Sequence, residues 1–84
     1  MLKLYQLETC PYCARVRAKM SEMGLTYINI NVPRIKTDRA ELIKVSGQAG
    51  VPTLVTDDGR IIADDDDEII LYLENTHGGN GQRI

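Results

Sequence analysis

The two cysteines of the chain, Cys10 and Cys13, are separated by two residues and lie where a strand is predicted to lead into a helix. Segment 2–7 has the pattern of a strand, and segment 14–23 has the pattern of an amphipathic helix. Both sulfur atoms are therefore expected at the first turn of one helix, where they can close a small disulfide ring. A strand-to-helix turn of this kind is a suitable place for a reactive thiol.

The helix after the cysteines has a recognisable buried side and clear ends. Val16, Met20 and Met23 recur at i, i+4 and i+7, which predicts a single apolar stripe. Pro11 suits the first helical turn, where a missing N–H costs nothing, and Gly24 suits the left-handed residue after the last turn.

Three more strands and two more helices are predicted along the rest of the chain. Asp38 is followed three residues later by Glu41, so we expect Thr37 or Asp38 to cap a helix that Gly47 ends. An acidic run before the last apolar segment would stabilise the positive end of a helix macrodipole. The predicted strands are 26–32, 53–56 and 61–63, with the last two forming a hairpin, and the predicted helices are 38–46 and 66–74.

The order β-α-β-α-β-β-α predicts an α/β fold with a four-stranded mixed sheet flanked by three helices. Its first connection should be a right-handed crossover between parallel strands. A chain of 84 residues holds one domain, which we place at 1–75. Residues 76–84 contain three glycines and no periodic pattern, so we expect a flexible C-terminal tail.

Charge and hydropathy restrict the partners. The net charge is −2 and the basic residues form no long run, which does not favour nucleic acid or an anionic membrane. No charged and then apolar leader follows Met1, and no apolar run approaches the ~20 residues of a membrane span. We therefore expect a soluble, cytoplasmic monomer whose partners are small molecules or other proteins.

The dithiol indicates redox chemistry, because the thiolate is the form that attacks a disulfide. Cys10 should precede the first helical turn, where unpaired N–H groups and the helix dipole favour a negative sulfur, so it is the predicted nucleophile. Cys13 lies one turn further in and is the predicted resolving thiol. Arg15 and Arg17 point to different sides of the helix, so at most one is expected to assist the thiolate.

Metal binding and a structural disulfide are the alternatives to redox chemistry. A structural zinc site needs four ligands, and the chain offers two cysteines and His77, so we expect no metal within one chain. A dimer that shares two dithiols around zinc or an iron–sulfur cluster remains open. A purely structural disulfide closes too small a loop to stabilise the fold much.

The sequence Cys10-Pro11-Tyr12-Cys13, together with a Val51-Pro52 dipeptide that opens the hairpin, closely resembles the dithiol glutaredoxins. The resemblance extends to about residue 74 and implies a thioredoxin-like fold. It further implies a glutathione-dependent thiol-disulfide oxidoreductase that reduces protein disulfides or glutathione mixed disulfides. In that family the proline is cis, and the backbone of the preceding residue pairs with the cysteinyl peptide of glutathione, which here are Pro52 and Val51.

The same resemblance assigns further glutathione contacts. Tyr12 would flank the tripeptide, and the segment at Asp65, Asp66 and Asp67 would receive its γ-glutamyl end through helix N–H groups and a carboxylate. Simple capping of the last helix by the same aspartates is an equally available interpretation.

Two positions depart from the glutaredoxin pattern. Leu7 stands where a lysine is common, and Ala63-Asp64 stands where a Gly-Gly is usual, which removes a cation and adds bulk and negative charge. The stretch from Val51 to Glu74 is also similar to the N-terminal domain of glutathione transferases. Because Leu7 and Ala63-Asp64 depart from the pattern, recycling by thioredoxin reductase is an alternative to recycling by glutathione. A non-catalytic binding module is a third possibility.

Overall fold

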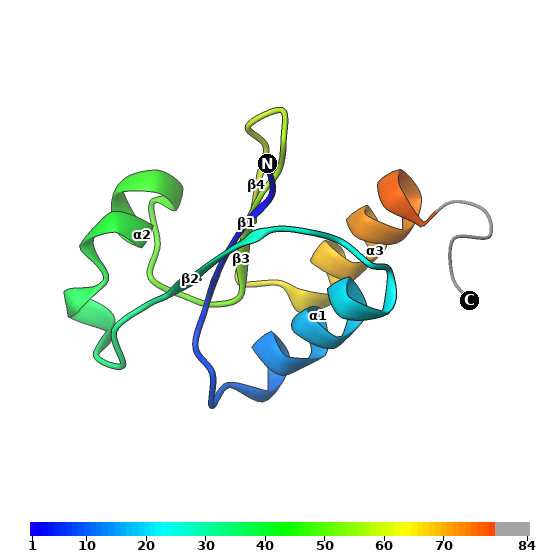
Figure 1. Cartoon of the computed structure of the whole chain (residues 1–84). Coiled ribbons are helices and arrows are strands. Elements are labelled where there is room, and N and C mark those ends of the chain that lie inside the picture. Colours follow the sequence, from blue (N-terminus) through cyan, green and yellow to red (C-terminus); the bar gives the residue numbers. More distant parts are fainter. Residues whose placement is uncertain (79–84) are drawn as a thin grey trace.

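The computed structural model describes residues 1–78, and it has the predicted order of strands and helices (Figure 1). A short 3-10 turn, η1, precedes the second α-helix. The elements are β1 Lys3–Gln6, α1 Pro11–Glu22, β2 Ile28–Asn31, η1 Lys36–Asp38, α2 Ala40–Ser46, β3 Thr53–Val55, β4 Ile61–Ala63 and α3 Asp66–His77.

The four strands form one mixed sheet in the order β2-β1-β3-β4. β1 pairs in parallel with β2 and antiparallel with β3, and β3 pairs antiparallel with β4. The predicted four-stranded mixed sheet is confirmed. β1 lies in the interior of the sheet, and the chain runs from its C-terminal end into the loop that carries Cys10.

The helices cover the two faces of the sheet unequally. α1 and α3 pack side by side on one face, whereas the short α2 lies on the other (Figure 1). The main core fills the space between the sheet and the α1–α3 pair, while a smaller cluster of Tyr5, Val32 and Leu42 lies under α2. Members of the main core include Leu2, Leu4, Val16, Met20, Leu54, Ile62, Ile69 and Leu73.

The start of the second helix differs from the prediction. α2 begins at Ala40, and its N-cap residue is Arg39, whose side chain makes no capping hydrogen bond. The carboxylate of Glu41, which we expected in a capping box with Asp38, instead accepts a hydrogen bond from the Tyr5 hydroxyl at 3.0 Å. Tertiary contact with the sheet thus replaces the local cap that the spacing suggested.

Arg39 instead binds backbone carbonyl groups in the interior. Its side chain is buried and donates to the carbonyl oxygens of Pro33 at 2.7 Å, Ala49 at 2.8 Å and Arg34 at 3.1 Å. These bonds connect the segment after β2 to the loop that leads to Val51. Arg39 therefore fixes that loop against the start of α2.

The last helix is longer than predicted. α3 begins at Asp66, as expected, but extends to His77 rather than ending at Glu74. Residues 79–84 of the predicted flexible tail lie outside the described residues. Across residues 1–78, the helices are all too short or too polar to cross a membrane.

Candidate active site

Cys10 lies at the start of α1, as predicted. It is the N-cap residue of the helix, with Pro11 as the first helical residue, and its backbone is extended at φ −83° and ψ 122°. Its N–H donates to the carbonyl of Leu7 at 3.1 Å, and its carbonyl accepts from the N–H of Ala14 at 3.0 Å. The Cys10 side chain is half-buried and makes no capping hydrogen bond. Both backbone groups are thus held while the residue stays partly exposed to solvent.

Cys13 lies one turn further along α1 and is fully buried. Its Sγ accepts a hydrogen bond from the N–H of Leu7 at 3.5 Å. Burial raises the pKa of the Cys13 thiol from 9.0 to about 11, and the neighbouring Cys10 side chain adds to the rise. The Leu7 N–H and the charge of Arg17 act on this pKa in the opposite direction. The two sulfur atoms thus differ in exposure, and Cys13 is a protonated thiol at neutral pH.

This difference predicts selective alkylation. At pH 8, iodoacetamide should modify Cys10 in the reduced, folded protein and leave Cys13 unmodified, because Cys13 is buried and its thiolate forms only as the pH approaches about 11. Mass spectrometry of peptides after timed quenching would check the order of labelling. The protein unfolded in guanidinium is the control, in which both cysteines should react. Equal labelling of both cysteines in the folded protein would contradict the assigned environments.

A pocket of about 180 Å³ lies beside the first turn of α1. The Val51-Pro52 peptide bond is cis, as the resemblance implied, and both residues line the pocket. Tyr12 lines it from α1 with a side chain that is 61% exposed, and Asp66 lines it from α3. Four of the residues predicted to contact glutathione therefore meet at one pocket.

Asp64 also lines this pocket, although it was not among the predicted site residues. Its φ is 55°, a left-handed value that is uncommon outside glycine and asparagine or aspartate. A Cβ at Gly50 would collide with the Asp64 carboxyl group, so the glycine leaves the space that this side chain fills. The departure from Gly-Gly thus places a carboxylate at the wall of the pocket.

The remaining predicted aspartates have local partners. The Asp65 carboxylate caps α3 by accepting from the N–H of Glu68 at 3.0 Å. The Arg15 guanidinium forms ion pairs with Asp66, at 2.7 Å, and with Asp67. Neither Asp65 nor Asp67 lines the pocket. Arg15 therefore joins α1 to the start of α3 and is not directed at the dithiol.

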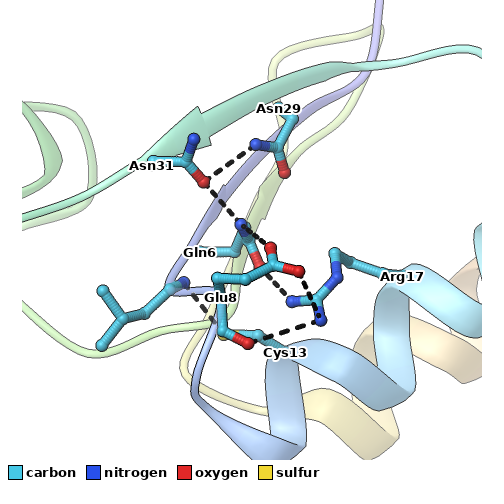
Figure 2. A network of polar contacts seen from close by, with 7 residues as sticks. Gln6, Glu8, Cys13, Arg17, Asn29 and Asn31 are labelled. Carbon is cyan, nitrogen blue, oxygen red and sulfur yellow. Dashed lines mark hydrogen bonds and ion pairs between the residues drawn. The ribbon is translucent and has the colours of Figure 1, made fainter.

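Arg17 belongs to a different polar network, which Figure 2 shows between β1, α1 and β2. Its guanidinium donates to Oε1 of Gln6 and, at 3.5 Å, to the carbonyl of Glu8. It also pairs with the Glu8 carboxylate at 3.4 Å. On the other side of Gln6, its Nε2 donates to Oδ1 of Asn31 at 2.6 Å.

Sequence reasoning did not identify Gln6 or Asn31, and it noted Asp64 only as a departure from the family pattern that adds negative charge. Gln6 is fully buried, but a single glutamine in a predicted strand belongs to no motif from which its burial or its partners could be predicted. Local sequence patterns also do not predict the register of β1 with β2, which places Gln6 opposite Asn31. Of the two arginines, Arg15 pairs with Asp66 and Asp67, and the charge of Arg17 lowers the pKa of Cys13.

Comparison with known proteins places this site in a family. The chain is 35% identical to Glutaredoxin 3 of Escherichia coli over 78 residues, which cover 93% of this chain and 89% of that protein. The chain belongs to the glutaredoxin family. This glutaredoxin is also 28% identical, over 88% of its length, to a protein of Clostridium pasteurianum described as an uncharacterized glutaredoxin-like 8.6 kDa protein in the rubredoxin operon. The alignment spans 99% of that relative.

This glutaredoxin also matches glutathione transferases through their N-terminal part. Residues 4–81 match the family "Glutathione S-transferase, N-terminal domain". An epsilon-class glutathione S-transferase from the housefly Musca domestica superposes on 95% of the chain with a TM-score of 0.82 and 26% identity. The chain spans only 37% of that transferase. These matches confirm the thioredoxin-like fold and the predicted similarity to the transferase domain.

The described residues also bear on metal binding by a single chain. Among residues 1–78, no group of three or more histidine, cysteine, aspartate or glutamate side chains is arranged to hold a metal ion.

The family and the dithiol together identify a glutaredoxin-like thiol oxidoreductase.

Proposed function

We propose that this protein reduces glutathione mixed disulfides and protein disulfides, with Cys10 as the nucleophile, Cys13 as the resolving thiol and glutathione as the reductant. The observation that carries the proposal is the contrast between the two sulfur atoms. Cys10 is half-exposed at the start of α1, whereas Cys13 is fully buried one turn behind it. The difference in exposure supports Cys10 as the thiol that meets a substrate disulfide and Cys13, one turn behind it, as the thiol that reacts second.

The reaction proceeds by two thiol–disulfide exchanges. The Cys10 thiolate attacks one sulfur of the substrate disulfide, and the other sulfur leaves as a thiolate that takes up a proton. Cys13 then loses its proton to solvent and attacks Sγ of Cys10, which forms the Cys10–Cys13 disulfide and releases the second substrate thiol. Two glutathione molecules reduce this disulfide and become one glutathione disulfide, so the electrons balance.

The pKa of Cys13, which burial raises most, should fall when Cys10 enters a mixed disulfide. Part of the rise comes from the Cys10 side chain, through a hydrogen bond and through its charge. When Cys10 becomes part of a mixed disulfide it no longer carries that charge, so this contribution is lost. The Cys13 thiolate then becomes easier to form at the step in which it is needed.

Glutathione is the proposed partner because of the pocket beside the dithiol. Val51 offers backbone groups next to Pro52, Tyr12 supplies an aromatic wall, and Asp66 brings the first residue of α3 to the pocket. Asp64 adds a negative charge to this pocket, so we expect weaker binding of the anionic tripeptide than a Gly-Gly sequence would give. We further expect the protein to act in the cytoplasm and as a monomer. Its mass in solution would test the oligomeric state.

The decisive assay is turnover of a glutathionylated peptide with each candidate reductant. Glutathione with glutathione reductase and NADPH should sustain many turnovers, while thioredoxin reductase with NADPH should sustain few or none. Omission of glutathione from the first mixture is the control. Turnover with thioredoxin reductase alone would overturn the glutathione assignment. A coloured or zinc-loaded dimer from anaerobic purification would instead support the carrier alternative.

A further inference from the structure

The network around Gln6 is not used by the proposed reaction, although it lies next to the resolving thiol. Gln6 is the last residue of β1, and its carboxamide is fully buried on the side of the sheet that faces α1. It accepts from the Arg17 guanidinium and donates to Asn31, so it connects α1, through its own strand β1, to the edge strand β2. Figure 2 shows the Arg17 side chain extending from α1 toward Gln6 and Glu8, with Cys13 on the same helix nearby.

We propose that Gln6 is a positioning residue that holds the Arg17 guanidinium near Cys13, where its charge stabilises the Cys13 thiolate formed during resolution. The same charge would stabilise Cys13 when glutathione attacks Cys10 and expels it. This inference rests on the proposed function, because it names the groups that assist the second exchange.

Helix geometry supports this role. Arg17 follows Cys13 by four residues, so the two side chains lie on the same side of α1, and a long helical side chain leans toward the N-terminus of its helix. The guanidinium is therefore carried back toward Cys13. The N–H of Leu7, which directly follows Gln6, donates to Sγ of Cys13. One strand end thus supplies both a direct donor to the sulfur and an anchor for the cation.

In the mixed disulfide, where Cys10 carries no charge, the other charged groups near Cys13 do not cancel this effect. Glu8 pairs with Arg17, but its side chain is 77% exposed while that of Arg17 is 23% exposed, so the carboxylate is the better screened of the two. β2 contributes the neutral side chains of Asn29 and Asn31 to the network. The carboxylates at the start of α3 that face α1 are paired with Arg15. The direction in which Arg17 moves the pKa of Cys13, downward, agrees with this arrangement.

A purely structural network would satisfy the buried amide of Gln6 without affecting Cys13. The experiment therefore measures the resolving step by itself. Stoichiometric protein is mixed with a disulfide-linked peptide, and conversion of the Cys10 mixed disulfide into the Cys10–Cys13 disulfide is followed by acid quench and mass spectrometry from pH 6 to 10. Arg17→Met removes the charge but keeps an apolar stem, and Arg17→Lys keeps the charge.

We expect Arg17→Met to slow the resolving step at pH 7 by about threefold to tenfold, the scale of one charge about 4 Å away at the dielectric constant of water. Its pH profile should move to higher pH, whereas Arg17→Lys should keep most of the wild-type profile. Gln6→Met, which leaves Arg17 unanchored, should move the profile in the same direction by a smaller amount. Lys19→Met is the matched control, because Lys19 pairs with Glu22 and Glu74 on α1 and α3 and should have no effect.

The outcomes separate this inference from the proposed function. If the wild type turns over and Arg17→Met keeps the same pH profile, or if Arg17→Lys behaves like Arg17→Met, the inference is wrong while the proposed function stands. If the wild type reduces no disulfide, the proposed function fails. The pH dependence of Cys13 alkylation in a Cys10→Ser background then still tests the effect of Arg17 on that thiol. Should Arg17→Met fail to fold, the comparison of wild type with Arg17→Lys and Gln6→Met decides the question.

Discussion

Cys10→Ser should abolish disulfide reduction, with turnover of a protein disulfide falling by at least about a thousandfold, because no other thiol is accessible at the start of α1. Cys13→Ser should behave differently. Its Cys10 thiolate can still take glutathione from a mixed disulfide, and a second glutathione can release it without Cys13. The measurement is steady-state turnover of two substrates, a glutathionylated peptide and a protein disulfide, with glutathione and glutathione reductase.

The pattern across the two substrates is more informative than either loss alone. Cys10→Ser should be inactive toward both, whereas Cys13→Ser should keep activity toward the glutathionylated peptide and lose most of it toward the protein disulfide. Ala14→Ser, which places a hydroxyl group next to Cys13 without removing a sulfur, is the control and should stay active toward both. Equal residual activity of the two cysteine variants would contradict the assigned roles.

The sequence was sufficient to predict the parts of the fold that local patterns determine. The start of α1 at Pro11, the turn at Gly24 and the hairpin of β3 and β4 follow from residues with strong conformational preferences, and all are present. The cis bond before Pro52 is also present, but propensity favours trans, so only the family resemblance could indicate it.

The start of α2 shows where local patterns fail. Asp38 and Glu41 have the spacing of a capping box, but Glu41 binds the hydroxyl of Tyr5, which lies 36 residues away. Such a contact depends on how α2 docks on the sheet. Docking also determines how much of the apolar side of β2 is buried. Ile28 stays 44% exposed because α2 covers only part of that face.

In the candidate site too, some residues could be predicted from local motifs and others could not. Cys10, Cys13 and Tyr12 could be found from one four-residue motif, and Val51-Pro52 could be found from its place before the hairpin. The roles of the charged residues could not, because each depends on a partner brought in by tertiary structure. Arg15 meets Asp66 and Asp67 across the α1–α3 contact, and the sequence separation gives no sign of this pairing.

Arg39→Met should lower the free energy of unfolding by about 3 kcal/mol, because it leaves three backbone carbonyls without their charged donor. The Arg39 side chain is only 4% exposed, so water cannot readily replace the guanidinium. Arg39→Lys should recover little of the loss, since one ammonium group cannot reproduce the forked geometry that reaches all three oxygens. Urea denaturation followed by circular dichroism measures the effect, with an unchanged m-value indicating that the same folded state unfolds.

The matched control for Arg39 is its neighbour Arg34, whose side chain is exposed and which contributes only its carbonyl to the Arg39 bonds. Arg34→Met should change stability by less than about 0.5 kcal/mol. A similarly small change in Arg39→Met would show that the three bonds add little to folding. Because one bond ends on Ala49, just before Gly50 and Val51, the Arg39→Met protein that remains folded should also bind glutathionylated peptides more weakly. A rise in KM larger than the fall in kcat would place that effect in the pocket rather than at the dithiol.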